Sequence, residues 1–538
     1  MPARQNAPKG RKRIVTDMKI QRLSRGEKIF FAVTLLLMIL SRTILLDQVP
    51  GDINPDEAMS GYNALTLLRN GTDNFGYPYP VYLSSWGSGQ NVLQSWLQIP
   101  FLLLFGVSNV TARLPMVICS VLSLIVLFAM ARRTLGNRFA LFLFFFASVT
   151  PWHLMASRWA LEANLAPFFL LFGLFFFLKG AENPKWFPLS GLFYGLSLYT
   201  YATIWTVIPF ILIAQILYLA FLKKLRLSRW TVGALAVLAL LAAPLVLFVL
   251  INRDIMDEIR LPFLSIPRMV SFRSGELSFR DMWPKFRHLV KTVCVGDTRL
   301  WNTVPEFGLY YYLSLPFVPV GGFVGIRDIV RSLKEKRVSL DFFFLAMALG
   351  GTALGCVLVV NVNQDNIIHF PVIFFAARGL WTVVRKIRWK RTAAAVTAVY
   401  FLLFGAFEIY YFGTYRVQIQ SDFGKGSEAA LKFVKENLGG YGRVYLDWRV
   451  SYARAYFYLE EDVNTLTETV SFSNYPDPYL SVSSFDRYIL EFSYDEPADL
   501  SAPYLLEQDS EGSVLVQSLL DNGYRVSVFD RFSVYWKE

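Results

Sequence analysis

Long apolar runs fill the first three-quarters of the chain, and short segments rich in polar and charged residues separate them. Most runs have the length, about 20 residues, that an α-helix needs to cross the hydrocarbon core of a bilayer. The pattern therefore predicts about 11 transmembrane helices. We expect them over residues 29–46, 110–131, 138–155, 160–178, 187–201, 203–222, 230–251, 307–326, 341–360, 366–384 and 393–412.

The other segments are too polar for a bilayer, and they divide the chain. A basic segment covers 1–28, a membrane region covers 29–412 with long loops at 47–109 and 252–306, and a tail covers 413–538. In the tail, "GSEAALKFVKENLGG" has the amphipathic pattern of a helix that ends at glycine. "GRVYLDW", "YRVSVFD" and "FSVYWKE" are rich in β-forming residues. The predicted fold class is mainly α, a polytopic helical membrane protein with a small C-terminal α/β domain.

Charge predicts the orientation of the chain. The composition is 54% hydrophobic with a net charge of +12, yet the tail after Tyr415 holds about twenty acids and about eleven bases. The basic excess lies at the N-terminus and at every second junction between apolar runs, which indicates cytoplasmic loops. We expect a plasma-membrane protein with a cytoplasmic N-terminus and with both long loops and the tail outside. Because no nucleic-acid motif accompanies the basic residues, nucleic acid is excluded as a partner.

Cysteine and histidine exclude two further classes of site. The three cysteines lie outside the tail and form no CxxC pair, so a disulfide framework is not expected. The three histidines are far apart in the sequence, which argues against a zinc site built on histidine.

"NPDE", residues 54–57, begins the first long loop. Asn54 is a good N-cap, proline suits the first helical position, and Glu57 completes a capping box. A helix over 55–69 that ends at Asn70 explains both acids. The alternative is catalytic, because a carboxylate beside the membrane surface can accept a proton from an acceptor hydroxyl. Asp56 and Glu57 are therefore candidate catalytic residues.

A second group lies in "SRWALEANLAPF", where Arg158 and Glu162 are four residues apart at the end of an apolar run. They share one face if this segment is helical, so a local salt bridge is one interpretation. Ionisable residues at membrane depth are costly to bury, and this favours a functional role.

Two further loops carry candidate binding residues. The loop over 252–306 is rich in arginine, including Arg260 and Arg268, which could clamp a lipid phosphate or form a solvated surface balanced by acids. In "NVNQDNIIHFP", Asn363, Asp365 and His369 crowd a short turn between apolar runs. This turn could line a sugar pocket or provide helix caps.

With these pieces in order, the chain resembles the GT-C membrane glycosyltransferases, in particular the bacterial branch related to protein O-mannosyltransferases and the lipid A aminoarabinose transferase. The resemblance covers about residues 28–411. It rests on the basic N-terminus, the acidic pair of the first loop, "TARLPMVICSVLSLIVLFAMARRTLGNRFA" and "SRWALEANLAPFFLLFGLFFFLKG". The tail lies outside it.

The resemblance implies a GT-C fold and a polyprenyl-phosphate-linked sugar donor. It implies that Asp56 is the catalytic base, that Glu57 is its companion, and that Glu162 is the second acidic position, where relatives often have aspartate. The lysine that some relatives use to hold phosphate has no equivalent in "YPYPVYLSSWGSGQ", so the phosphate contact is expected from Arg158 or the basic loop. The acceptor is a protein, a glycan or a glycolipid, and magnesium or manganese is an open cofactor.

Three other functions fit parts of the pattern. A polysaccharide polymerase or ligase uses lipid-linked substrates on the same face of the membrane. A lipid flippase or transporter also places charges near membrane cavities, although the chain shows neither an inverted repeat nor paired broken helices. A receptor with the tail as its sensor would not need Asp56, Arg158 and Glu162. Consumption of a polyprenyl-phosphate sugar without an ion gradient separates these functions.

Overall fold

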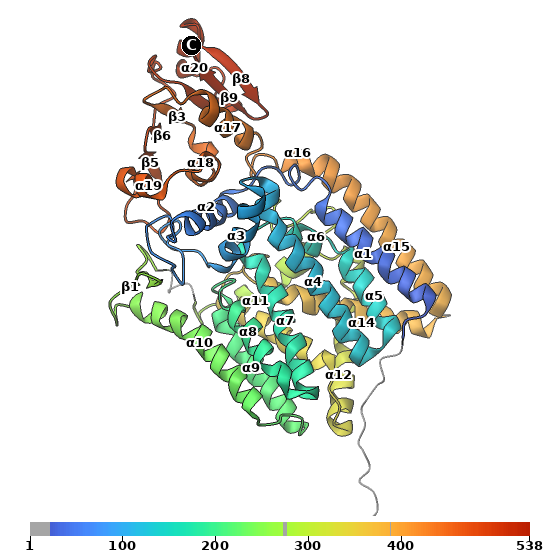
Figure 1. Ribbon diagram of the computed structural model, residues 1–538. Helices are drawn as coiled ribbons and strands as arrows, with labels where there is room; N and C mark the ends of the chain where they lie inside the picture. Colours follow the sequence, from blue (N-terminus) through green and yellow to red (C-terminus); the bar gives the residue numbers. More distant parts are fainter. Residues whose placement is uncertain (1–21, 273–276, 388, 538) are drawn as a thin grey trace, which may run out of the picture.

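The computed structural model describes residues 22–272, 277–387 and 389–537 (Figure 1). Most of the basic segment expected over 1–28 lies outside the described residues. A bundle of long helices forms the larger part of the molecule. A smaller domain, formed by the C-terminal part of the chain, lies at one end of the bundle.

Eight helical segments of the described chain are long and apolar enough to cross a membrane. They contain α4 (Asn109–Leu135), α7 (Glu162–Glu182), α9 (Ile204–Phe221), α10 (Arg229–Ile251), α12 (Phe317–Glu335), α13 (Leu340–Val357), α14 (His369–Lys386) and α15 (Trp389–Tyr410). The count rises to nine if the bent pair α5 (Asn137–Ser148) and α6 (Pro151–Ser157) is one span. The other two predicted spans correspond to α1 (Arg25–Thr43), which carries charges at both ends, and to α8 (Phe187–Ser197), which has 11 residues.

Phenylalanine-rich helices form the centre of the bundle. In α5 every residue from Phe139 to Ser148 is buried, because α1, α4 and α14 pack around it. A helix that is apolar on all sides is stable only when it is surrounded in this way. The chain then turns by 62° between α5 and α6, where Pro151 occupies the first turn of α6. This break brings residues 158–162 to the end of the bundle that faces the first long loop.

The first long loop, residues 47–109, contains α2 (Pro55–Arg69) and α3 (Leu93–Phe105). All residues of α2 from Glu57 to Leu67 are buried. This burial is unusual for a loop helix, and it arises because α2 packs against α3 and also against α18 (Tyr452–Leu459) of the tail. Figure 1 shows α2 between the bundle and the tail.

The second long loop, residues 252–306, has little regular structure in its described part. It contains the antiparallel pair β1 (Ile259–Leu261) and β2 (Leu264–Ile266), followed by α11 (Met282–Val295). Ser265 of β2 accepts a backbone hydrogen bond from Val81 at 3.0 Å, so the two long loops are joined.

The tail is built around one mixed sheet of seven strands in the order β4-β5-β6-β3-β7-β9-β8. β3 runs parallel to β6 and β7, and the other neighbours are antiparallel. Its strands are β3 (Val444–Leu446), β4 (Ser471–Phe472), β5 (Val482–Phe485), β6 (Tyr488–Ile489), β7 (Tyr504–Glu507), β8 (Arg525–Phe529) and β9 (Phe532–Trp536). Its helices are α17 (Ser427–Asn437), α18, α19 (Val463–Thr469) and α20 (Val514–Asp521), and α16 (Arg416–Gln418) precedes them. The predicted tail helix and its three predicted strands are confirmed.

Polar contacts hold the tail domain, the part of the chain built around this sheet, against the first long loop. The Arg454 guanidinium of α18 donates to the Ile53 carbonyl at 2.7 Å. The Asp52 carboxylate accepts from the Glu428 backbone N–H at 2.9 Å, at the start of α17. The Leu480 N–H donates to the Trp86 carbonyl at 3.0 Å. The tail is therefore in direct contact with the loop that carries the candidate catalytic acids.

Candidate active site

The predicted cap of α2 is present. The Asn54 side chain accepts from the Glu57 N–H at 2.9 Å, and the Glu57 carboxylate accepts from the Asn54 N–H at 2.9 Å. Pro55 is the first residue of the helix, and Asn70 is its C-cap. Each contact satisfies a backbone donor that the first turn of a helix would otherwise leave without a partner.

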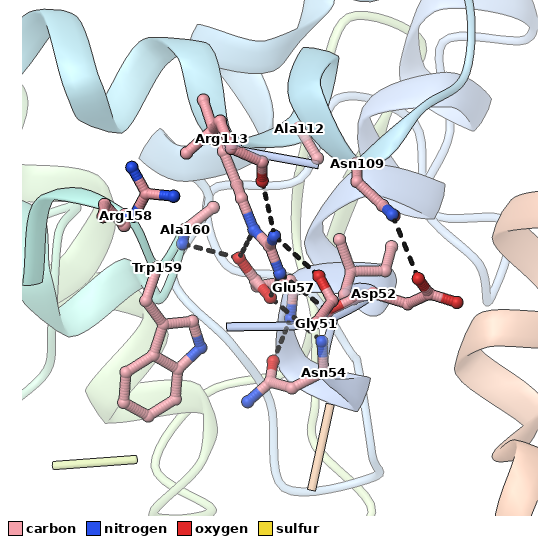
Figure 2. A network of polar contacts seen from close by, with 12 residues as sticks. Gly51, Asp52, Asn54, Glu57, Asn109, Ala112, Arg113, Arg158, Trp159 and Ala160 are labelled. Atoms are coloured by element: carbon pink, nitrogen blue, oxygen red, sulfur yellow. Dashed lines mark hydrogen bonds and ion pairs between the residues drawn. The ribbon is translucent and has the colours of Figure 1, made fainter. Parts of the chain in front are cut away.

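Glu57 is also the centre of a buried ion pair (Figure 2). The Arg113 guanidinium of α4 donates to both Glu57 carboxylate oxygens at 3.0 Å, and both side chains are fully buried. With the Asn54 N–H, the Ala160 N–H at 2.8 Å brings the number of donors to four. A carboxylate with this many strong partners has little capacity left for a substrate proton. These contacts hold the Glu57 side chain in place at the start of α2.

Arg113 connects that ion pair to the chain that enters α2. Its remaining N–H groups donate to the carbonyls of Leu46, Gly51 and Asp52 at 2.7 to 3.0 Å. One guanidinium thus fixes residues 46–57 relative to α4. Arg113 lies in the "TARLP" motif, but sequence reasoning did not single it out, because all these partners belong to a distant segment of the chain.

Asp56 lies next to this network without belonging to it. Its side chain is partly buried, and burial together with the neighbouring charge of Glu57 raises its pKa to about 6. The Trp86 indole N–H favours the charged form and opposes this rise in pKa. That N–H is buried and has no hydrogen-bond partner of standard geometry. A carboxylate with a raised pKa and accessible oxygens is suited to take up a proton.

Glu162 begins α7 on the other side of the same region. It is buried, and its carboxylate accepts a hydrogen bond from the Asn91 N–H that precedes α3. It lies close enough to Asp56 for the two carboxylates to repel each other. Arg158 makes no salt bridge with Glu162, so the local pair that a four-residue spacing suggests does not form between them. The fold instead brings Glu162 toward Asp56, which lies far earlier in the sequence.

Buried side chains with unpaired polar atoms lie in and near the segment 90–94, which contacts these two acids. Gln90 donates to the Asp56 carbonyl at 3.2 Å, but its side-chain oxygen is unpaired. Both polar side-chain atoms of Asn91 and of Gln94 also lack partners, and so does the indole N–H of Trp159. Buried polar groups in proteins are normally hydrogen-bonded. A group of unpaired ones beside two carboxylates indicates a site for a polar ligand or water.

Arg158 faces a different set of partners. Its guanidinium donates to the carbonyls of Ser41, Leu45 and Val49 at 3.0 Å, and it lies over the Phe412 ring at 5.0 Å. Figure 2 shows it apart from the Glu57–Arg113 pair. The Nε–H of Arg158 is buried and has no partner. Arg158 thus holds the end of α1 while its Nε–H stays without a partner.

The polar turn between α13 and α14 reaches the same end of the bundle. Asn363 donates to Asn302, and His369 contacts the Tyr310 hydroxyl and the Val362 carbonyl. Both carboxylate oxygens of Asp365 are buried without a partner. Asn366, which sequence reasoning treated only as part of the turn, donates to Asn164 of α7 at 2.9 Å, two residues after Glu162.

The two arginines of the second long loop that were predicted to bind substrate, Arg260 and Arg268, have protein partners. Arg260 donates to the Gly76 carbonyl at 2.7 Å and stacks on the Tyr77 ring at 4.9 Å. Arg268 pairs with Asp254, and both side chains are exposed. Arg260 therefore lies against the first long loop, whereas Arg268 lies on the surface of its own loop.

In the part of the chain that the structure describes, no group of three or more histidine, cysteine, aspartate or glutamate side chains is arranged to hold a metal ion. We therefore assign no residue to a metal.

Comparison with known proteins identifies the fold. Residues 90–248, which run from the first long loop through α10, match the family model described as dolichyl-phosphate-mannose-protein mannosyltransferase. No curated relative matches the sequence. The crystal structure of ArnT from Cupriavidus metallidurans bound to undecaprenyl phosphate is similar, with a TM-score of 0.54 at 13% identity. The similarity covers 94% of this chain and 97% of that one. The chain has the GT-C fold.

The GT-C fold confirms the resemblance and the fold class that were predicted from the sequence. Apo ArnT from the same organism gives a TM-score of 0.53 at 14% identity over the same fractions of both chains. The structure of the oligosaccharyltransferase AglB from Archaeoglobus fulgidus has a TM-score of 0.45 at 14% identity, over 81% of this chain and 64% of that one. Because the ArnT match covers 94% of this chain, the shared GT-C architecture extends into the tail, beyond the region expected from the sequence.

Proposed function

We propose that this protein is an integral-membrane glycosyltransferase that moves a sugar from a polyprenyl-phosphate-linked donor to an acceptor on the outer face of the membrane. The carrying observation is that Asp56 and Glu162, in a GT-C fold, are hydrogen-bonded to the adjacent residues Gln90 and Asn91, whose side chains include buried polar atoms without partners. The N-terminus is cytoplasmic in this proposal, and the long loops and the tail domain are outside.

Asp56 is the general base in this mechanism. As the acceptor hydroxyl oxygen attacks the anomeric carbon of the donor sugar, the Asp56 carboxylate takes up its proton. The bond between the anomeric carbon and the phosphate oxygen breaks, and the electron pair leaves with the lipid phosphate. A single direct displacement of this kind inverts the anomeric centre.

The neighbouring groups prepare Asp56 for that step. Arg113 and Glu57 fix the first turn of α2, which is the reason the Asp56 carboxylate has a defined position. Glu162 and the unpaired amide of Asn91 orient the acceptor hydroxyls or the donor sugar. Preorganised groups of this kind favour a transition state because they need no rearrangement during the reaction.

Positive charge is required on the leaving-group side. Arg158 supports this role, because its buried Nε–H has no protein partner and three of its other donors are engaged by backbone carbonyls. A guanidinium held rigidly in this way can donate to a phosphate oxygen as negative charge develops there. Arg260 and the polar turn with Asn363, Asp365 and His369 are proposed as the outer contacts to the substrates.

The test is transfer from a panel of radiolabelled polyprenyl-phosphate sugars by the purified full chain in detergent, with membrane extract as acceptor. Detergent removes any ion gradient, so label that moves from lipid to acceptor establishes a glycosyltransferase and identifies its donor. A folded protein that transfers no sugar in detergent, but moves labelled lipid across the bilayer in vesicles, would show a flippase instead.

The pKa of Asp56 predicts a pH profile. A base must be deprotonated to act, so kcat/KM is expected to rise with pH, to level off above about 6, and to fall at lower pH as Asp56 gains a proton. Trp86→Phe removes the N–H that favours the charged carboxylate, so this variant should move the acidic limb to higher pH. Initial rates between pH 4.5 and 8 test the wild-type profile and its displacement in the variant. An acidic limb at the same pH in Trp86→Phe as in the wild type would contradict the prediction.

A further inference from the structure

A cavity of about 270 Å³ lies between the first long loop and the tail domain. The loop contributes Asn74, Phe75 and Trp86. The tail contributes Tyr452 and Tyr456 from α18, Thr467 from α19, and Phe472 from β4, together with three aliphatic side chains. Neither part of the chain forms this cavity alone.

The lining has the character of a ligand site. Five of its side chains are aromatic, and its polar lining residues include Asn74 and Thr467. Ligand sites usually combine a mostly apolar or aromatic wall with a few such polar groups that set orientation. The C–H groups of a sugar ring pack well on aromatic faces, which carry partial negative charge.

The cavity adjoins the proposed base. Trp86 and Tyr452 lie edge to face with ring centres 5.1 Å apart, and both interact electrostatically with the Asp56 carboxylate. Contacts at the cavity edge fix this arrangement. The Tyr452 hydroxyl donates to the Leu480 carbonyl at 3.1 Å, and the Leu480 N–H donates to the Trp86 carbonyl. Two of the lining residues, Trp86 and Tyr452, are therefore neighbours of Asp56, which does not itself line the cavity.

We infer that this cavity binds a sugar ring of the acceptor, which makes the acceptor a glycan or glycolipid. This inference rests on the proposed function, because it assigns the cavity to the acceptor of the transfer that Asp56 catalyses. The donor is a lipid and approaches from the membrane bundle. The cavity lies where the tail domain covers the first long loop. This position leaves the bundle side free for the donor, so the cavity is assigned to the acceptor. Its volume is near the lower end of ligand pockets, about 300 Å³, and fits one ring better than a peptide segment.

Binding is tested first without any donor. Saturation-transfer difference NMR is recorded on the full chain in detergent with methyl glycosides of mannose, glucose, galactose and arabinose. The test variant is Thr467→Trp, which fills the cavity. The control is Glu468→Trp, which places the same side chain on the same helix at an exposed position that does not line the cavity. Phe472→Leu keeps the apolar bulk but removes one aromatic face.

At least one glycoside is expected to bind wild type and Glu468→Trp equally, and Thr467→Trp should weaken that binding at least about tenfold. Phe472→Leu should weaken it by a smaller factor. Absence of binding to wild type, or equal binding by Thr467→Trp, would overturn the inference. Because no donor is present, this result is independent of whether transfer has been detected.

The kinetic test uses the donor found in the transfer assay. Thr467→Trp is expected to raise KM for the acceptor at least about tenfold while the KM for the donor stays unchanged. Transfer to a serine or threonine peptide that is unaffected by Thr467→Trp would show a protein acceptor and would overturn the inference while the glycosyltransferase remains. A chain that binds glycosides in the cavity but transfers nothing would instead count against the proposed function.

Discussion

Asp56→Asn is expected to reduce the rate of sugar transfer by about 10² to 10⁴-fold, the range typical of losing a general base. Asparagine has nearly the same shape, but its amide oxygen is a poor proton acceptor at neutral pH. The capping box uses Asn54 and Glu57 and leaves the Asp56 side chain out, so α2 should be retained. Initial rates with the labelled donor measure the effect.

The same variant separates chemistry from stability. Burial raises the pKa of Asp56 in the folded protein, so ionising it above about pH 6 opposes folding, and Asn removes that penalty. The thermal unfolding midpoint at pH 7 should therefore be unchanged or slightly higher. Asp495→Asn, at an exposed position of the tail, is the matched control and should leave both rate and midpoint unchanged. Normal turnover by Asp56→Asn would show that Asp56 is not the catalytic base and that it serves only at the start of α2.

Arg113→Met is expected to destabilise the fold by about 3 to 5 kcal/mol, because removal of one partner leaves the Glu57 carboxylate charged and buried without compensation. The carbonyls of Leu46, Gly51 and Asp52 lose their donor as well. The thermal midpoint in detergent should fall sharply, and transfer should fall with it because the first turn of α2 loses its anchor.

Two further variants make this measurement specific. Arg331→Met removes an arginine from an exposed pair with Glu335 one helical turn away, and such pairs contribute about 0 to 1 kcal/mol. Arg113→Met combined with Glu57→Gln should recover part of the lost stability, since no buried charge then remains. If Arg113→Met costs no more than Arg331→Met, the network in Figure 2 does not hold the loop.

Local signals in the sequence predict local structure well here. The cap of α2 follows from Asn54, Pro55 and Glu57, because all its contacts lie within one turn of the helix. The tail helix α17 and strands β3, β8 and β9 follow from short periodic patterns for the same reason. The bend between α5 and α6 had one local signal, Pro151, but the apolar run around it predicted a single span.

Contacts between distant segments explain the rest. Glu57 was paired with Asp56 as a second catalytic acid, but its strongest partner, Arg113, lies on a different helix, α4. The unpaired amides of Gln90, Asn91 and Gln94 have no motif, and their significance depends on burial that only the folded chain has. The contact between the tail domain and the first long loop depends on α18, which is separated from α2 by the whole membrane bundle in the sequence.

The packing of α18 on α2 has a consequence for biosynthesis. About 380 residues separate the two helices, so at about 5 to 20 residues per second the ribosome needs roughly 20 to 80 s to supply the cover for α2. During that interval Ala58, Met59 and Tyr62, which are buried in the finished protein, lack their partner helix. A nascent chain that is released early would thus carry Asp56 and Glu162 and yet expose these side chains of α2 to quality-control proteases.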